Sequence, residues 1–233
     1  MNIALILSGG TGARMYSKIP KQYIEIGGMS IVEYCINKLS LHNGIDAIQI
    51  VADLPWHDQI KECFDQRETR NKFRGFSAPG LNRQLSIYQG LKDIKEYAED
   101  SDYVLIHDAA RPVISEALIT RCLSAAAGHD GVMPVLPMKD TVYYSTDGVE
   151  VKSLLNRNEI YAGQAPELFQ LGAYYEANKK LLPDQILKIN GSTEPAIIAG
   201  LDIVMIPGEE SNFKITTKSD LERFRKMIEE TSL

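Results

Sequence analysis

The sequence has few cysteines and no long apolar runs. Its 233 residues include three cysteines, Cys35, Cys63 and Cys122, which are widely spaced and lie in apolar, helix-like patterns. The absence of a Cys-x-x-Cys pair argues against a zinc or redox site, so we expect three buried, reduced thiols. No apolar run approaches the roughly 18 residues of a membrane span, which predicts a chain without transmembrane segments.

The sequence also lacks an excess of positive charge. It has 31 acidic against 25 basic residues, which gives a formal net charge of −6. Surfaces that bind nucleic acids or anionic membranes are usually broadly basic, so neither kind of partner is expected. The strand-like N-terminus, Met1–Leu7, has no basic region and no cleavage site, so no signal peptide is predicted. We therefore expect a cytoplasmic protein, in which a local basic pocket can still occur.

What the sequence does contain is an alternation of short apolar runs and helical patterns. Buried strands are predicted at Ile3–Leu7, Ala47–Val51, Tyr103–His107, Val132–Val135 and Ile203–Ile206. Helices are predicted at Ile31–Leu41, Arg83–Tyr97 and Glu116–Gly128, the last with Ser115 as its N-cap. This alternation predicts a single α/β domain over residues 1–233, with a doubly wound, Rossmann-like, mostly parallel sheet. Ligands of such sheets bind beyond the carboxyl ends of the strands.

One region departs from this alternation. Lys139–Asn158 contains two β-prone runs, Thr141–Tyr144 and Val149–Leu155, separated by Ser145–Gly148. An Asp-Gly pair between such runs is a hairpin signal. Because this hairpin has no evident core-facing side, we interpret residues 139–158 as a protruding β-arm that packs on a partner.

The C-terminal part returns to the earlier pattern. Phe213–Thr216 is predicted as a short strand, and a final helix is predicted from about Ser219 to Glu230. Ser219 and Glu222 have the spacing of a capping box at the start of this helix.

The first strand is followed by a glycine-rich stretch. Ser8–Met15 reads Ser-Gly-Gly-Thr-Gly-Ala-Arg-Met, and its glycines allow backbone N–H groups to turn inward as an anion cradle. Arg14 and Lys21 add positive charges suited to phosphate oxygens. Attack on the α-phosphorus of a nucleoside triphosphate builds negative charge, which fixed cations stabilise. The stretch matches neither G-x-G-x-x-G nor a P-loop, which argues against a dinucleotide dehydrogenase and a P-loop kinase.

Further motifs, taken with their order and spacing, carry a family resemblance. They are Pro20–Tyr23, the Arg-x-x-Ser segment in Gly80–Ile87, His107–Pro112, Asp140-Thr141, Asn156-Arg157 and Asn212–Thr216. From Ile3 to about Leu221 the chain resembles the 2-C-methyl-D-erythritol 4-phosphate cytidylyltransferase family and its relatives, the ribitol-5-phosphate cytidylyltransferases. The resemblance implies a fold of the nucleotide-diphospho-sugar transferase type. It also implies transfer of a cytidylyl group from CTP to a polyol phosphate, either 2-C-methyl-D-erythritol 4-phosphate, as in isoprenoid biosynthesis, or a related acceptor. It also implies Mg²⁺ bound with CTP and a homodimer formed through the β-arm.

The resemblance implies roles for individual residues as well. The implied catalytic residues, which hold the reacting phosphates, are Arg14, Lys21, Lys214 and Arg157. The implied nucleotide-binding residues are Ser8, Gly9, Gly10, Gly12, Gly80, Arg83, Ser86 and Asp108. The implied acceptor-binding residues are Asp108, Arg111, Thr141 and Arg157, with Arg157 serving the neighbouring subunit and Asp108 the candidate magnesium ligand. An acceptor phosphate is already anionic, so the site needs positioning and charge cancellation rather than a general base.

Several positions depart from the family pattern. Gln164–Glu167 reads Gln-Ala-Pro-Glu where the family usually has Gln-Thr-Pro-Gln, and Asn190–Pro195 replaces a Thr-Asp-Glu segment. Leu81 and Tyr16 stand where a polar residue and a glycine are usual. Because the donor half is intact, we expect CTP use to be kept. The altered segments predict an acceptor other than methylerythritol phosphate, such as ribitol 5-phosphate or another capsule- or teichoic-type polyol phosphate.

Two other functions compete with this interpretation. A nucleotide-sugar glycosyltransferase of similar topology would need an Asp-x-Asp metal motif at a strand end, where this chain has His107-Asp108-Ala109. A catalytically inactive CTP-binding homologue would be consistent with the altered segment around Ala165. Release of pyrophosphate distinguishes an enzyme from such a homologue.

Overall fold

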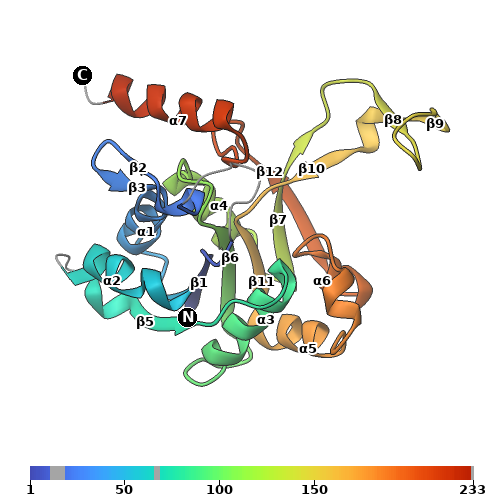
Figure 1. Ribbon diagram of the computed structural model, residues 1–233. Coiled ribbons are helices and arrows are strands. Elements are labelled where there is room, and N and C mark those ends of the chain that lie inside the picture. The colour runs from blue at the N-terminus through green and yellow to red at the C-terminus, as the bar shows by residue number, and fades with distance from the viewer. Residues whose placement is uncertain (11–18, 66–68, 232–233) are drawn as a thin grey trace.

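A mixed sheet forms the centre of the molecule (Figure 1). The structure, a computed structural model, describes residues 1–10, 19–65 and 69–231. Within these residues one sheet has the order β10-β7-β11-β6-β1-β4-β5, and β12 also pairs with β7. Its strands are β1 (Asn2–Leu7), β4 (Ala47–Val51), β5 (Phe73–Ser77), β6 (Tyr103–Asp108), β7 (Gly131–Pro137), β10 (Tyr161–Gly163), β11 (Glu167–Gln170) and β12 (Ile203–Pro207). Only β10 and β11 run antiparallel to their neighbours, so the predicted mostly parallel sheet is confirmed.

Helices cover both faces of this sheet. One face carries α1 (Ile31–Leu41), α2 (His57–Asp65) and α4 (Glu116–Ser124). The other carries α3 (Arg83–Ile94), α5 (Leu171–Lys179) and α6 (Glu194–Ile198). Along β1, Ala4 and Ile6 pack in the first apolar layer, whereas Ile3 and Leu5 pack in the second. A strand buried on both faces must be apolar throughout, which explains the continuous apolar run at the N-terminus.

Local signals correctly predicted several further features. The Ser115 side chain accepts a hydrogen bond from the backbone N–H of Leu118 and caps α4. The three cysteines are buried in α1, α2 and α4, and none of them forms a disulfide with another described residue. No helix in the described part of the chain is long and apolar enough to cross a membrane.

The C-terminal region differs from the prediction in two ways. Residues 213–216 form no strand and contact the chain after β6 through one backbone hydrogen bond, from Ile215 N–H to the Ala110 carbonyl. The last helix, α7 (Lys218–Thr231), agrees with the helix predicted from about Ser219 to Glu230, but its cap lies elsewhere. Its capping box is formed by Thr217 and Asp220: the Asp220 carboxylate accepts the N–H of Thr217, and the Asp220 N–H donates to Thr217 Oγ1. Asp220 therefore takes the place in the capping box that was predicted for Glu222.

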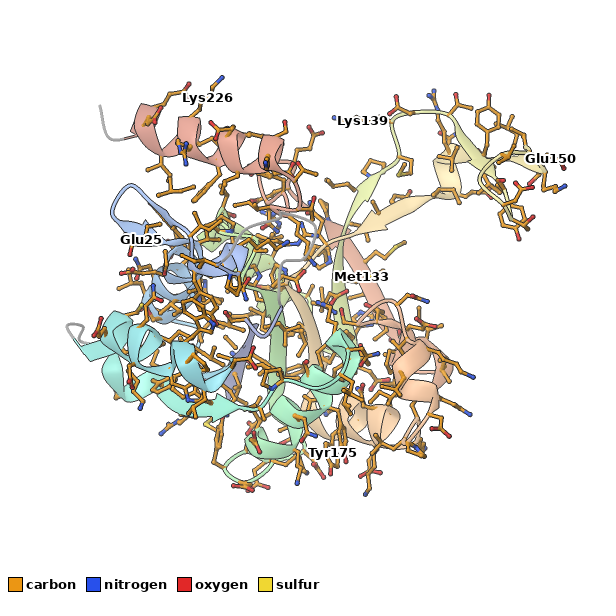
Figure 2. All side chains as sticks on the ribbon, viewed as in Figure 1. Glu25, Met133, Lys139, Glu150, Tyr175 and Lys226 are labelled. Atoms are coloured by element: carbon orange, nitrogen blue, oxygen red, sulfur yellow. The ribbon has the colours of Figure 1, made fainter. Side chains whose placement is uncertain are left out.

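The arm is a separate two-stranded sheet, β8 (Val142–Tyr144) and β9 (Ser153–Leu155), that projects from the body. Figure 2 shows Lys139 near its base and Glu150 toward its tip. The second strand begins four residues later than predicted, because Asp147 organises a longer turn by accepting the N–H groups of Val149 and Glu150. Five large apolar side chains of the arm are more than half exposed: Tyr143, Tyr144, Val149, Val151 and Leu154.

Candidate active site

A pocket opens at the edge of the sheet where β1 and β6 end. Its volume is about 480 Å³. Residues predicted for the site form much of its lining: Gly9, Gly10, Lys21, Gly80, Arg83, Ser86, Asp108 and Lys214. Gly12 and Arg14 lie outside the described residues. The carboxyl ends of parallel strands are where ligands of this fold class bind, so the pocket is the candidate active site.

Two glycines form the wall of the pocket near β1 and α3. A Cβ atom on Gly9 would lie 2.7 Å from Pro79, and one on Gly80 would lie 2.6 Å from Leu85. Any side chain at these positions would force its neighbours to move. Ser86 fixes the second glycine, because its hydroxyl accepts the Gly80 N–H at 2.9 Å. The wall is therefore bare backbone, which a ligand can approach closely.

Gln22 holds the start of the glycine-rich stretch, a role that the sequence analysis missed. Its Nε2 donates to the carbonyl oxygens of Ser8 at 2.8 Å and Gly10 at 2.6 Å. The Ser8 side chain is buried and its hydroxyl is bonded to the Tyr23 hydroxyl, so Ser8 supports the wall from behind instead of lining it. The signal available in the sequence was the position of Gln22 directly after Lys21 in the Pro-Lys-Gln segment.

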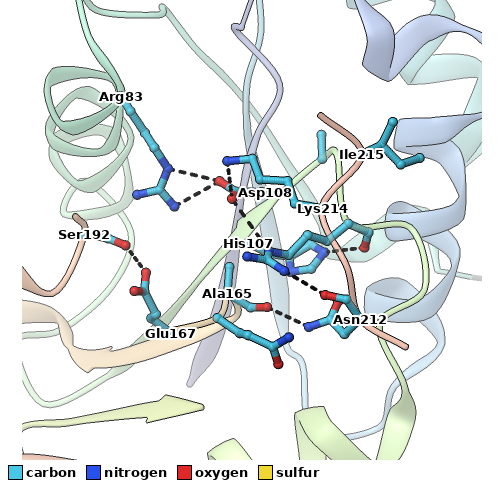
Figure 3. A network of polar contacts seen from close by, with 12 residues as sticks. Arg83, His107, Asp108, Ala165, Glu167, Ser192, Asn212, Lys214 and Ile215 are labelled. Carbon is cyan, nitrogen blue, oxygen red and sulfur yellow. Dashed lines mark hydrogen bonds and ion pairs between the residues drawn. The ribbon is translucent and has the colours of Figure 1, made fainter. Parts of the chain in front are cut away.

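Asp108 ends β6 and gathers three cations around one carboxylate (Figure 3). Arg83 places Nε and Nη2 at 3.0 and 2.9 Å from Oδ1, and Lys214 Nζ lies 2.8 Å from Oδ2. Arg111 Nε lies farther away, at 3.9 Å from Oδ2. Burial alone would raise the pKa of Asp108, but the charges of Arg83 and Lys214 outweigh it and hold the pKa well below its usual range. Asp108 is therefore ionised, and the surplus positive charge suits a phosphate ligand.

Arg111 and His107 lie behind this carboxylate. Arg111 Nη1 donates to the Asn212 carbonyl at 2.7 Å, and Arg111 is not among the described residues that line the pocket. His107 is fully buried, and its Nε2 lies 3.1 Å from the Arg111 carbonyl oxygen. Burial lowers the pKa of His107 to about 4, so the imidazole is neutral at physiological pH. Both side chains brace the end of β6 in this structure.

Two predicted acceptor-binding residues lie away from the pocket. Thr141 and Arg157 are exposed on the arm, and neither is among the described lining residues. Arg157 Nη1 donates to the Lys139 carbonyl at 3.0 Å, which ties the two sides of the arm together near its base. One chain alone therefore does not bring these residues to Asp108.

Glu167 lies beside the site, although the sequence analysis gave it no role. It begins β11 and pairs with Ile106 of β6, two residues before Asp108. Its buried carboxylate accepts hydrogen bonds from the hydroxyl groups of Ser192 and Thr193. Burial raises the pKa of Glu167 to about 7, although the charge of Arg83 acts in the opposite direction. The signal in the sequence was the acid in the Gln-Ala-Pro-Glu segment.

Asp108 is also the candidate magnesium ligand. The described residues contain no group of three or more His, Cys, Asp and Glu side chains placed to hold a metal. Mg²⁺ in nucleotide sites is commonly held by one or two carboxylates together with phosphate oxygens. The Asp108 carboxylate stays ionised, so it could contribute one ligand to a magnesium ion held mainly by the triphosphate, provided that one of its oxygens gives up its pairing with Arg83 or Lys214.

Comparisons with known proteins connect this site to one family. The model of the 2-C-methyl-D-erythritol 4-phosphate cytidylyltransferase (IspD) family matches residues 2–230. The chain belongs to this family. The family consists of nucleotidyltransferases, so the predicted enzyme class is confirmed.

Relatives of this family carry two kinds of name. A 2-C-methyl-D-erythritol 4-phosphate cytidylyltransferase from Syntrophus aciditrophicus is 31% identical, over 94% of this chain and 92% of its own length. A ribitol-5-phosphate cytidylyltransferase from Vibrio parahaemolyticus is 29% identical, over 98% of this chain and 96% of its own. The chain spans about half, 56%, of a bifunctional relative from Maricaulis maris. The crystal structure of a 4-diphosphocytidyl-2C-methyl-D-erythritol synthase from Anaerococcus prevotii matches with a TM-score of 0.83 and 27% identity, covering 98% of this chain and 96% of that one.

Proposed function

We propose that this protein transfers a cytidylyl group from CTP to a small polyol phosphate and releases pyrophosphate. The observation that carries the proposal is the meeting of Arg83 and Lys214 at the buried Asp108, beside a pocket walled by glycine. The names of the relatives support a polyol phosphate as the acceptor.

The reaction needs positioned positive charge more than proton transfer. An oxygen of the acceptor phosphate attacks the α-phosphorus of CTP, and the bond from that phosphorus to the β-phosphate oxygen breaks. Lys21 and Lys214 are suited to stabilise the charge that develops, because Lys21 Nζ donates to the carbonyl of Ile215, the residue after Lys214. Arg14 is the further cation that we propose. A magnesium ion, with Asp108 as its proposed ligand, would neutralise part of the triphosphate charge when bound.

We also propose that two chains form a homodimer through the arm. The exposed apolar side chains of β8 and β9 support this proposal, because contact with a partner would bury them. Thr141 and Arg157 are exposed on the arm and could reach the phosphate of an acceptor in the partner's pocket. For the location we propose the cytoplasm, which the three buried cysteines support, because none of them forms a disulfide with another described residue.

A pyrophosphate-release assay tests the proposed reaction. CTP and Mg²⁺ are combined with 2-C-methyl-D-erythritol 4-phosphate, ribitol 5-phosphate or glycerol 3-phosphate, and turnover with at least one of them is expected. Lys214→Ala should lower kcat/KM about 100-fold, the usual scale for a lost transition-state contact. Lys218→Ala, which removes an exposed lysine from the start of α7, is the matched control and should leave the rate unchanged. Binding of CTP without turnover on any acceptor would instead favour the inactive homologue.

A further inference from the structure

The segment around Lys214 forms no strand, so separate contacts fix its position. Before Lys214, the Asn212 carbonyl accepts a hydrogen bond from Arg111 Nη1 at 2.7 Å. After it, the N–H and hydroxyl groups of Thr216 donate to a carboxylate at the start of α7, both at 2.8 Å. Ile215 lies between these two anchors, and its contacts therefore decide how the middle of the segment is held.

The backbone of Ile215 connects Lys21 to the turn that follows Asp108. Its N–H donates to the Ala110 carbonyl at 2.8 Å, and its carbonyl accepts a hydrogen bond from Lys21 Nζ at 2.5 Å. Lys214, the preceding residue, places its Nζ 2.8 Å from Asp108 Oδ2 (Figure 3). Two lysines that line the pocket, although far apart in the sequence, are thus connected through one residue.

The side chain of Ile215 is fully buried in a third apolar cluster, distinct from the two layers that cover the sheet. The buried members of this cluster are Ile26, Ile31, Ile215 and Phe224. The first of them lies in a hairpin, β2 (Glu25–Ile26) and β3 (Met29–Ser30), which follows the short turn that carries Lys21. The last lies in α7, which Figure 1 shows beside this hairpin. Packing in the third apolar cluster therefore fixes the segment of Lys214 against that of Lys21.

Two lysines that line one pocket need a rigid frame. Their ammonium groups carry like charges, and the repulsion between like charges grows where water is partly excluded. The charge that develops on the reacting phosphates is stabilised best by groups that are already in place. A displacement of about 1 Å can cost about 100-fold in rate. A side chain that prevents such a displacement therefore contributes to the rate without touching the substrate.

We propose that Ile215 is a positioning residue that holds Lys21 at a fixed place relative to Lys214 during cytidylyl transfer. The proposal rests on the proposed function and adds to it a residue outside the reacting groups. The buried side chain fixes the Ile215 carbonyl, and this carbonyl anchors the ammonium group of Lys21. An ammonium group has three N–H donors, so this anchor is compatible with a contact to a phosphate oxygen. Ile215 is not among the described residues that line the pocket, so it acts through the lysine.

Ile215→Ala tests the proposal, because it keeps the carbonyl and removes most of the buried side chain. The kcat for pyrophosphate release, measured with the acceptor that turns over fastest, should fall about 10-fold or more. The dissociation constant of CTP, measured by calorimetry, should change less than about threefold, since the glycine wall is untouched. Ile94→Ala is the matched control at the end of α3 distant from Arg83, where Ile94 is also fully buried. It should lower the urea midpoint of unfolding and keep the wild-type kcat.

A double-mutant cycle with Lys21→Ala separates positioning from general packing. If Ile215 acts through Lys21, then Ile215→Ala should lower kcat by at most about threefold once residue 21 is alanine. The low rates of the Lys21→Ala proteins are measured at a raised enzyme concentration. A larger loss in that background overturns the proposal, because Ile215 would then support the fold without acting through the lysine.

Phe224→Leu provides an independent measurement if Ile215→Ala does not fold. It loosens the third apolar cluster from α7, so kcat should fall about threefold, and this loss should disappear once residue 21 is alanine. An unchanged kcat in the variants that fold overturns the proposal while cytidylyl transfer stands. Absence of turnover by the wild type with every polyol phosphate overturns the proposed function itself, and the positioning role of Ile215 with it.

Discussion

The pocket around Asp108 and the β-arm are organised in opposite ways. In the pocket, the carboxylate of Asp108 is buried and already paired with Arg83 and Lys214 of the same chain. On the arm, Val149 is 86% exposed and Leu154 is 65% exposed. The central carboxylate of the pocket therefore finds its partners within one chain, whereas the arm presents an apolar surface without a cover from the described residues.

One chain therefore forms the contacts of the pocket by itself, whereas the contacts proposed for the arm require a second chain. Contacts that depend on strand ends, such as those of Asp108, are fixed when the chain folds. Contacts proposed for Thr141 and Arg157 depend on assembly, because both residues lie on the arm. Substitutions in the pocket should therefore change stability and catalysis together, and substitutions on the arm should change assembly and catalysis while sparing the stability of the single chain.

The largest effect is expected from Asp108→Asn. The substitution keeps the shape of the side chain but leaves Arg83 and Lys214 without their counter-charge. We expect kcat/KM for pyrophosphate release to fall by about 100-fold or more. The free energy of unfolding should fall by about 3 kcal/mol, because one partner of a buried ion pair is lost. Enzyme kinetics and urea unfolding at pH 7 measure the two effects.

The pH dependence of the free energy of unfolding provides a second measure of the role of Asp108. The folded-state pKa of Asp108 lies below its unfolded value near 3.8, so its contribution to stability is full above that value and is lost as pH falls toward the folded-state pKa. Asp108→Asn lacks this contribution. Asp58→Asn, whose side chain is 95% exposed, is the control and should behave like the wild type. An Asp108→Asn protein with full activity would contradict the central position of this carboxylate.

Glu167→Gln should change the pH dependence of the free energy of unfolding in the direction opposite to that of Asp108→Asn. Burial raises the pKa of Glu167 from 4.5 to about 7, so the folded protein keeps a proton that the unfolded chain releases between these values. Its contribution to stability is full below pH 4.5 and is lost as pH rises through 7. Relative to the wild type, the variant should therefore gain up to about 3 kcal/mol between pH 5 and pH 8, at about 1.4 kcal/mol per pKa unit. Urea unfolding at both pH values measures this gain. If the free energy of unfolding changed equally between pH 5 and pH 8 in the wild type and in Glu167→Gln, the raised pKa of Glu167 would be contradicted.

How well the sequence predicted the fold depended on burial. β1, β4 and β6 were found because they are buried on both faces and read as short, mainly apolar runs. β5 has the sequence Phe-Arg-Gly-Phe-Ser, with one exposed and three partly buried residues, so it gave no comparable signal. β10 and β11 are three and four residues long, and tertiary pairing rather than local pattern defines them. The same holds for residues 213–216, which have a strand-like composition but no neighbouring strand.

In the candidate site, too, some residues could be predicted from the sequence and others could not. Residues that follow strands, such as Gly9 and Asp108, could be placed in the pocket because the fold class fixes where strand ends gather. Ser8 is the neighbour of a lining residue, yet it faces the core, and one sequence gives no sign of that orientation. The contact between Glu167 and Ser192 joins residues 25 positions apart through packing of a loop against β11, which spacing alone could not predict.

Leu154→Asp tests the arm with a smaller expected effect. Its side chain is exposed in the single chain, so the free energy of unfolding should change by less than about 0.5 kcal/mol. If the arm packs on a partner, the new charge must lose water at the interface, and we expect dissociation with an activity loss of about 10-fold. Sedimentation velocity and pyrophosphate release measure the two outcomes. Leu54→Asp, at a site that is 78% exposed and outside the arm, is the control, and a fully active monomeric Leu154→Asp would refute the role of the arm.

The smallest effect is expected where the pocket joins α7. Asp220 Oδ2 accepts hydrogen bonds from the backbone N–H and hydroxyl groups of Thr216 and Thr217, all at 2.8 or 2.9 Å. Thr216 lines the pocket, so this turn links the start of the helix to the site. Burial acts to raise the pKa of Asp220, but these donors lower it to about 2, so the cap is ionised at neutral pH.

Asp220→Ala removes the acceptor of all four hydrogen bonds. We expect the free energy of unfolding to fall by about 1 kcal/mol, the typical value of a helix cap. The KM for CTP should rise by less than about threefold, because Thr216 loses an anchor but Lys214 keeps its pairing with Asp108. Ser219→Ala is the matched control, since Ser219 is exposed and was the cap predicted from sequence. If Ser219→Ala lowered the free energy of unfolding as much as Asp220→Ala, Ser219 would also cap the helix, contrary to the contacts of Asp220 described above. An activity loss in Asp220→Ala as large as that of Asp108→Asn would extend the catalytic region into this turn, since the cap would then hold more of the site than Thr216 alone.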